Sequence, residues 1–381
     1  MPTVLQVLPR LGGSGGVERE TQYISRAIAG AGWRSMISSG EEADGEAAAD
    51  AGARHAALPV ARRNPVQAPG TIRRLARLIA EEDVDLVHAR SRWPAWLAYY
   101  AARRAGRPFI TTFHGAYSTG AAPMKLKRRY NAIMTRGARV IAISEFIARH
   151  IVENYTVEPG RIRTIPRGVD LAAFDPARVA PDRLAALRDA WRVPEGLPVV
   201  MLPGRLTALK GHLALLDALA RIEESVCCLF VGAGDANRAG YRARVEQRIA
   251  ALGTAHDVRL TGPCGDMPAA YLLADIVVSP SLRPEAFGRV PAEAQALGRP
   301  VIVFAHGGAL ETVLDGETGC LVPPGDIDAL ADSIRQTLGA SPAERSRVAS
   351  AGQAHVRRNF TLEGMCGATL DVYRELLPAS S

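Results

Sequence analysis

Short runs of apolar, largely β-branched residues recur along the whole chain, and segments long enough to form a helix separate them. Such runs predict buried strands at 4–8, 35–38, 84–88, 109–113, 140–143, 161–165, 198–202, 227–231, 258–261, 275–279, 300–304 and 320–322. A strand that is apolar without interruption is typical of a parallel sheet covered by helices on both faces. The pattern therefore predicts an α/β protein with doubly wound parallel sheets.

The length of 381 residues allows two such domains. We expect an N-terminal domain over 1–175 and a second domain over 197–360. Between them, 176–196 contains Pro176, Pro181 and Pro194, a composition that suits a linker. The closing segment 361–381 carries apolar residues at helical spacing and is predicted to form an amphipathic helix.

Apolar stretches and cysteines indicate the compartment. The apolar runs fall well short of the roughly 20 residues needed to span a bilayer, and the first residues read as a strand rather than as an export signal. The five cysteines are odd in number and include no C-x-x-C pair. We expect reduced core thiols in a cytoplasmic protein.

Positive charge gathers in the first half of the chain. The net charge of +7 divides into +9 for residues 1–175 and −2 for the rest. Two basic stretches, 72–79 and 125–130, also carry apolar residues. They are either ordinary amphipathic helices with solvated basic faces or a surface that binds an anionic membrane.

A glycine-rich turn follows the first predicted strand. Gly13 and Gly15 fit the start of a dinucleotide fingerprint, but Glu18 stands where its third glycine is expected. A carboxylate beside a pyrophosphate is unfavourable, so the turn is either an anion site at a helix start or a plain tight turn. His114 follows the strand 109–113 and is expected at the carboxyl edge of the sheet, where ligands of open α/β sheets bind.

The second half carries charged residues at the same kind of edge. Arg205 and Lys210 lie in one strand-to-helix loop and are suited to clamp a diphosphate. Glu285 and Glu293 flank Phe287 and Gly288 in a later loop and the helix after it. One carboxylate is suited to accept ribose hydroxyls and another to hold sugar hydroxyls.

In these motifs the chain resembles the retaining glycosyltransferases of family 4, and the resemblance covers essentially the whole chain. It rests on 15–18, 113–115, 165–170, Gly204-Arg205, Lys210-Gly211, the E-x7-E element from Glu285 to Glu293, Gly307-Gly308, Glu311, 315–319 and 322–324. The family implies the GT-B fold, two facing Rossmann-like domains, with the C-terminal helix returning to the N-terminal domain. Two departures stand out: Arg167 where Asn is common and Arg289 where an aliphatic residue is usual.

The resemblance also implies the reaction and the roles of residues. A hexose-type sugar would pass from a nucleotide diphosphate sugar to a cell-envelope glycan or lipid-linked acceptor, with retention and without a metal or other cofactor. Catalytic roles fall to His114, Arg205, Lys210 and Glu285; donor binding to Gly16, Arg205, Lys210, Glu285, Phe287, Gly288 and Glu293; acceptor or membrane contact to Lys125, Lys127, Arg128 and Arg129. The protein would be cytoplasmic and peripheral on the inner face of the membrane.

A front-face reaction is the favoured mechanism, because the sequence shows no carboxylate that could serve as a nucleophile at the anomeric carbon. The departing phosphate would take the acceptor proton, and cations would stabilise its charge. Alternatives are a nucleotide-sugar epimerase or phosphorylase of the same fold, or a non-enzymatic protein that binds membranes or nucleic acid, although no nucleic acid is expected.

Overall fold

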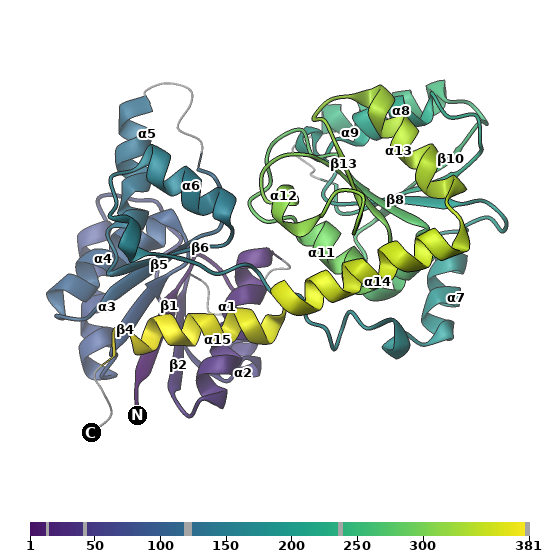
Figure 1. Ribbon diagram of the computed structural model, residues 1–381. Helices are drawn as coiled ribbons and strands as arrows, with labels where there is room; N and C mark the ends of the chain where they lie inside the picture. The colour runs from purple at the N-terminus through teal and green to yellow at the C-terminus, as the bar shows by residue number, and fades with distance from the viewer. Residues whose placement is uncertain (13–14, 41–43, 118–123, 235–238, 378–381) are drawn as a thin grey trace. The chain divides into compact units, whose positions relative to one another are not determined.

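The computed structural model describes residues 1–12, 15–40, 44–117, 124–234 and 239–377, and its chain divides into two units (Figure 1). Unit 1 comprises Met1–Gly168 together with Leu362–Ser381, and unit 2 comprises Val169–Thr361. Each unit is built around one parallel sheet.

Unit 1 alternates strands and helices along most of its length. Its strands are β1 (Thr3–Val7), β2 (Arg34–Ser39), β3 (Ala53–Ala57), β4 (Leu86–Ala89), β5 (Phe109–Phe113), β6 (Arg139–Ala142) and β7 (Ile162–Thr164). Its helices are α1 (Gly16–Gly30), α2 (Asp44–Asp50), α3 (Ala68–Glu81), α4 (Arg92–Arg104), α5 (Met124–Asn131), η1 (Ala132–Thr135), α6 (Glu145–Asn154), η2 (Pro159–Arg161) and α15 (Leu362–Arg374).

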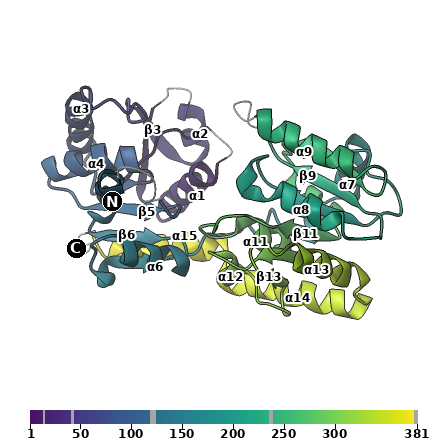
Figure 2. The same cartoon turned by 90° about the horizontal axis from the view of Figure 1, so that it is seen from above.

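The sheet of unit 1 has the order β3-β2-β1-β4-β5-β6-β7, and Figure 2 shows it running from β3 past β5 to β6. Every pairing is parallel; Leu5 of β1, for example, lies opposite Met36 of β2 and Val87 of β4. All carboxyl ends of the strands therefore meet at one edge, and the loops that follow β1, β4 and β5 lie there together.

The C-terminal helix α15 packs on the sheet of unit 1, next to α1 (Figure 1). Met365 and Leu370 lie in one apolar cluster with Ile24 of α1 and Ile110 of β5. The Tyr373 hydroxyl also forms a 2.8 Å hydrogen bond with Nδ1 of the buried His88. These contacts account for the return of the last helix to the first unit.

Unit 2 is also a strand-and-helix alternation. Its strands are β8 (Val199–Pro203), β9 (Cys227–Val231), β10 (Asp257–Gly262), β11 (Ile276–Ser279), β12 (Val301–Phe304) and β13 (Cys320–Val322), in the order β10-β9-β8-β11-β12-β13. Its helices are η3 (Pro176–Arg178), α7 (Pro181–Ala190), η4 (Ala208–Lys210), α8 (His212–Leu219), α9 (Ala239–Ala251), α10 (Met267–Leu273), α11 (Arg289–Ala296), α12 (Ala309–Thr312), α13 (Ile327–Gly339) and α14 (Pro342–Asn359).

Helices cover both faces of the second sheet. In Figure 1, α8, α9 and α13 lie above it and α7, α11 and α14 below. The segment 176–196, expected as a linker, lies within unit 2 and forms η3 and α7. Leu187 and Trp191 pack on the core beside Tyr271, which explains why this proline-rich stretch is an integral part of the unit.

Two parallel, doubly wound sheets were predicted, and this fold class is confirmed. The sequence analysis missed β3, an edge strand that pairs only with β2 and reads Ala-Arg-His-Ala-Ala. All five cysteines are free, three of them buried. Within the described residues, no helix is long and apolar enough to cross a membrane.

Candidate functional site

Arg205 and Lys210 lie beyond the carboxyl end of β8, in the loop that leads through η4 into α8. Arg205 is exposed and forms no ion pair with any described residue. Lys210 is half-buried, and its Nζ donates a 2.6 Å hydrogen bond to Oε1 of Glu285. One cation of the predicted clamp is therefore free, and the other already faces a carboxylate.

Glu285 is held at this edge by side-chain and backbone contacts. The Ser281 hydroxyl donates to the same Oε1 that accepts from Lys210. The Glu285 carbonyl accepts a 2.8 Å hydrogen bond from the amide of Gly308. A Cβ at Gly307 would stand 2.6 Å from that carbonyl oxygen, so only glycine allows the two loops to lie this close.

Opposing influences act on the Glu285 carboxyl. Burial, the largest of them, raises its pKa, but Lys210, Ser281 and Arg289 together outweigh burial and bring the pKa below the ordinary 4.5. Glu285 is therefore ionised at neutral pH, and it forms a compact ion pair with Lys210.

Gly288 connects this loop to α11. Its φ of 92° lies in the left-handed region, which favours glycine, and it forms the N-cap of the helix. Phe287 beside it is 3% exposed and packs edge-on against Phe360, with ring centroids 5.4 Å apart. Phe287 can thus offer a ligand its backbone, whereas its side chain anchors the loop.

Glu293 lies in α11, 7% exposed, with both carboxylate oxygens in contact with partners. Oε2 accepts a 2.9 Å hydrogen bond from the Tyr271 hydroxyl, and Oε1 lies 3.2 Å from Nε of Arg289. Arg289, one of the two departures from the family pattern, therefore pairs with the carboxylate expected to bind ribose. Burial and the neighbouring Glu293 raise the pKa of Tyr271 well above its ordinary value, so this hydroxyl keeps its proton.

The corresponding edge of unit 1 holds His114 in a buried polar network. Arg167, the other departure, donates a 3.0 Å hydrogen bond through Nη2 to Nδ1 of His114. Glu20 of α1 lies between two arginines. Its Oε2 is 3.2 Å from Nε of Arg167, and its Oε1 accepts a 2.8 Å hydrogen bond from Nη1 of Arg90. Arg90 is 1% exposed and also donates twice to the amide oxygen of Gln6.

This network fixes the protonation of His114. Burial, together with the positive charges of Arg167 and Arg90, lowers the pKa of His114 well below 6.5, so the ring is neutral at pH 7. A guanidinium only donates; Nδ1 must therefore accept, and the ring proton lies on Nε2. Nε2 is buried and has no hydrogen-bond partner among the described residues.

A cavity of about 310 Å³ opens beside His114. Residues that follow three neighbouring strands line it: Pro9 and Arg10 after β1, Arg90, Ser91 and Arg92 after β4, and His114, Gly115 and Tyr117 after β5, together with Val17 and Glu18 of α1. A volume of this size suits a small molecule or one end of a larger one. The edge where ligands of open α/β sheets bind is thus hollowed in unit 1.

The remaining residues singled out in the sequence also belong to unit 1. Gly16 is the first residue of α1, whereas Gly13 lies outside the described residues. Lys127, Arg128 and Arg129 are exposed on α5; the backbone of Lys125 belongs to the same helix, but its side chain is outside the described part.

The sequence predicted that Lys210 and Glu285 lie at the same sheet edge. It did not predict three residues that surround the site. Glu20, Arg90 and Tyr271 are buried polar groups that reach the singled-out residues. A signal was present for Arg90, because it stands directly after the carboxyl end of a predicted strand, as His114 does. Among the residues that the structure describes, no group of three or more His, Cys, Asp or Glu side chains is arranged to hold a metal ion.

Two family models together match most of the chain. The model described as Glycosyltransferase Family 4 matches residues 14–173, and the model described as Glycosyl transferases group 1 matches residues 185–355. The first match covers most of unit 1 and extends to residue 173 in unit 2, and the second lies within unit 2.

Relatives and solved structures agree with these models. The chain is 31% identical over 311 residues to a D-inositol 3-phosphate glycosyltransferase of Streptomyces bingchenggensis, covering 77% of this chain and 67% of that protein. It is 30% identical to a GDP-mannose-dependent alpha-(1-6)-phosphatidylinositol monomannoside mannosyltransferase of Mycolicibacterium smegmatis, covering 75% of each. The crystal structure of a glycosyltransferase from Rickettsia africae ESF-5 superposes with a TM-score of 0.90 at 35% identity, covering 100% of this chain and 99% of that one.

Proposed function

Because the chain belongs to glycosyltransferase family 4 and is a glycosyltransferase of the GT-B fold, we propose that it moves a hexose from a nucleotide diphosphate sugar to a cell-envelope glycan or glycolipid. The anomeric configuration is retained, and neither a metal nor another cofactor takes part. The similarity to a mannosyltransferase that acts on a phosphatidylinositol mannoside supports a lipid-linked acceptor.

The observation that carries this proposal is the cluster at the carboxyl edge of unit 2. Glu285 of the Lys210–Glu285 pair stands three residues before the Gly288 turn at the start of α11, and the exposed Arg205 belongs to the same loop after β8 as Lys210. Arg205 and Lys210 hold the diphosphate of the donor, and Glu285 with the backbone of Phe287 and Gly288 holds the sugar. The 2.6 Å contact between Lys210 and Glu285 fits a donor in which phosphate and sugar are adjacent groups.

The rate of the reaction is limited by breaking the bond at the anomeric carbon, and the two cations lower the barrier to this step. As the bond between the sugar and the phosphate oxygen breaks, negative charge grows on the diphosphate. Arg205 and Lys210 stabilise that charge more in the transition state than in the bound donor. The acceptor hydroxyl attacks from the same face, and its proton passes to the departing phosphate oxygen, so atoms and charge balance without a protein base.

Glu293 holds the ribose of the nucleotide. Its contacts with Tyr271 and Arg289 orient the carboxylate, which accepts hydrogen bonds from the ribose hydroxyls. The ribose contact exists before and after transfer, so Glu293 contributes to binding rather than to the chemical step.

The acceptor binds at the edge of unit 1. The neutral His114 donates a hydrogen bond from Nε2 to an acceptor or sugar oxygen, and Arg167 fixes the tautomer that makes this possible. Gly16, expected to contact the donor, is the first residue of α1, and the next two residues of that helix line the cavity beside His114. The exposed basic residues of α5 bring unit 1 to the inner face of the cytoplasmic membrane, where a lipid-linked acceptor resides.

A panel of nucleotide sugars tests the proposal. Purified protein is incubated with UDP-, GDP- and ADP-sugars and a membrane extract as acceptor, and release of nucleotide diphosphate is measured. We expect one donor to be consumed, with acceptor-dependent release that Arg205→Ala abolishes and the matched control Arg221→Ala leaves intact. Release from no donor, or release unaffected by Arg205→Ala, would contradict the assigned donor site.

A further inference from the structure

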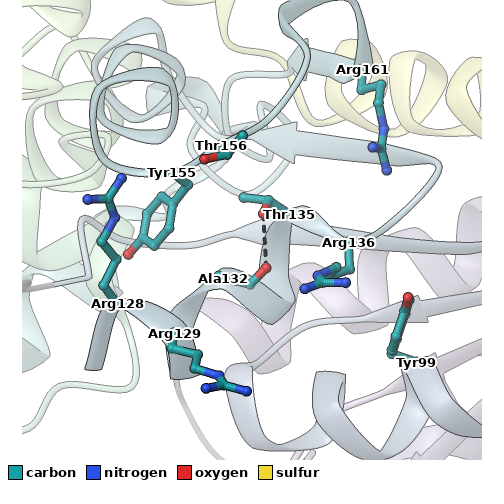
Figure 3. A pocket seen from close by; sticks show the side chains of 9 residues that line it. All are labelled: Tyr99, Arg128, Arg129, Ala132, Thr135, Arg136, Tyr155, Thr156 and Arg161. Atoms are coloured by element: carbon teal, nitrogen blue, oxygen red, sulfur yellow. Dashed lines mark hydrogen bonds between the residues drawn. The ribbon is translucent and has the colours of Figure 1, made fainter. Parts of the chain in front are cut away.

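A cavity of about 650 Å³ in unit 1 shares none of its lining residues with the cavity beside His114 (Figure 3). Arg128 and Arg129 of α5 lie on one side of it, and Tyr99, Arg136 and Arg161 on the other. The rest of the lining is Ala132, Thr135, Tyr155 and Thr156. Four guanidinium groups thus face one cavity whose lining contains no carboxylate.

Arg128, Arg129 and Arg136 are exposed and Arg161 is half-buried, whereas several other arginines of unit 1 have a carboxylate partner. Arg34, Arg90, Arg139 and Arg163 each pair with a glutamate. By contrast, none of the four pocket arginines pairs with a carboxylate in the described ranges. Like charges gathered without a counter-charge repel one another, so the arrangement favours an anion between them.

The pocket is separate from the His114 edge. Arg136 precedes β6 and Arg161 precedes β7, so both stand at the amino ends of parallel strands, whereas His114 follows the carboxyl end of β5. Tyr99 belongs to α4, which packs on Phe109, while the neighbouring Ile110 faces the cluster formed with α15. The pocket therefore lies on the helix-covered face opposite α15. Its lining also includes Tyr155, whose ring lies 5.8 Å from that of Phe113 at the carboxyl end of β5, but no residue lines both this pocket and the cavity beside His114.

We propose that this pocket is a second, non-catalytic binding site for a phosphate-bearing ligand with two or more negative charges. The planar guanidinium group matches phosphate oxygens with paired hydrogen bonds, which a single lysine cannot do. Arginines on both sides of the cavity suit two phosphate groups or a phosphomonoester, and the exposed Thr156 adds a hydroxyl donor. The volume is sufficient for an organic phosphate.

Inorganic pyrophosphate is the probe for the pocket itself, titrated by calorimetry at low salt. Arg136→Gln is the main variant, because Arg136 is exposed and has no ion pair among described residues, so the fold should tolerate the change. We expect it to weaken one binding event at least about tenfold, since a charge-assisted hydrogen bond is worth a tenfold change or more. Arg136→Gln/Arg161→Gln should abolish that event, although Arg161 also donates to the Gly137 carbonyl, so its melting temperature is checked.

Two further variants separate this site from the donor clamp and from general charge. Pyrophosphate also suits the clamp in unit 2, so Arg205→Ala should remove a different binding event and leave the pocket's event unchanged. Arg104→Gln removes an exposed arginine of α4 that does not line the pocket and should change neither. Pyrophosphate binding that is the same in Arg136→Gln, Arg104→Gln and wild type would overturn the proposal.

A vesicle experiment distinguishes a lipid headgroup from a soluble phosphate. Phosphatidylcholine vesicles with or without phosphatidic acid are sedimented with wild type and Arg136→Gln. If the ligand is a lipid phosphate, Arg136→Gln lowers binding to the phosphatidic acid vesicles; if it is soluble, vesicle binding is unchanged while pyrophosphate binding falls. Both results support the site, and neither depends on sugar transfer, so the proposal can fail while the proposed function stands.

Discussion

Replacing Lys210 by alanine should destabilise the protein, because it leaves the Glu285 carboxylate without its cationic partner. Lys210 and Glu285 form their 2.6 Å pair with side chains 25% and 24% exposed, so water replaces the lost partner only in part. A hydrogen bond to a charged group contributes about 1.5 to 3 kcal/mol. For a domain of the size of unit 2, a loss of about 2 kcal/mol lowers the melting temperature by about 4 to 8 °C.

The cost of Lys210→Ala should also depend on pH. In the wild type, the folded-state pKa of Glu285 lies below the ordinary 4.5, so its stabilisation is full above that pH and is lost as the pH falls through the folded-state pKa. In the variant, burial is no longer outweighed by Lys210, so the pKa rises and the carboxyl takes up its proton at a higher pH. The gap in melting temperature should therefore narrow as the pH is lowered from about 7.5 to about 5.

Calorimetric or fluorescence melting of a double-mutant cycle checks this. Lys210→Ala in the Glu285→Gln background should cost much less than in the wild type, because a neutral amide does not need the cation. Arg221→Ala is the control, since its pair with Asp328 is exposed and should contribute less than about 1 kcal/mol. An equal cost in both backgrounds, or a melting temperature equal to that of the wild type, would refute the ion-pair reasoning.

Three further predictions concern ligands. Arg205→Ala, at an exposed residue without an ion pair among those described, should lower turnover by about 10² to 10³ with no change in melting temperature; wild-type turnover at saturating donor would refute the clamp. Glu293→Gln should weaken nucleotide sugar and free nucleotide diphosphate alike, whereas Glu285→Gln should weaken mainly the sugar donor; calorimetric titration with both ligands separates the two, and equal losses in Glu285→Gln would contradict the roles. Changing the four basic residues of α5 to Gln should remove salt-sensitive co-sedimentation with anionic vesicles, and binding indifferent to lipid charge would reduce the basic half to a solubility feature.

The strands that could be predicted are those whose residue types alone indicate burial. Runs such as 227–231 and 301–304 are apolar throughout because both faces of a central strand are covered. The strand Ala53–Ala57 contains no β-branched residue, and its position at the sheet edge comes from pairing with β2. Pattern reasoning had no local signal for it.

Within the candidate site, position could be predicted but partners could not. The order of strand and loop indicates that Lys210 and Glu285 share an edge, since both follow parallel strands. Lys210 and Glu285 are 75 residues apart in the sequence. Their direct contact depends on how the 284–288 loop packs against Gly307 and Gly308. Likewise the contact of Glu20 with Arg90, 70 residues away, is a product of tertiary packing.

The two departures from the family pattern also gained a physical meaning only from the structure. Arg167 supplies the hydrogen bond that sets the tautomer of His114, and Arg289 lies against Glu293. The type of a residue indicates its charge and size. Its effect on a neighbouring side chain can be judged only when the distance between the two side chains is known. The segment 176–196 makes the same point, because its prolines suit a linker while Leu187 and Trp191 bury it.

Metal-independent transfer with retention at the unit 2 edge is the central claim, and the anomeric configuration of the product tests it most directly. Proton NMR follows the reaction with the consumed nucleotide sugar and its acceptor in the presence of a chelator. The account predicts a product with the anomeric configuration of the donor, formed at an undiminished rate. An inverted anomer, or no transfer once the chelator is added, would contradict it.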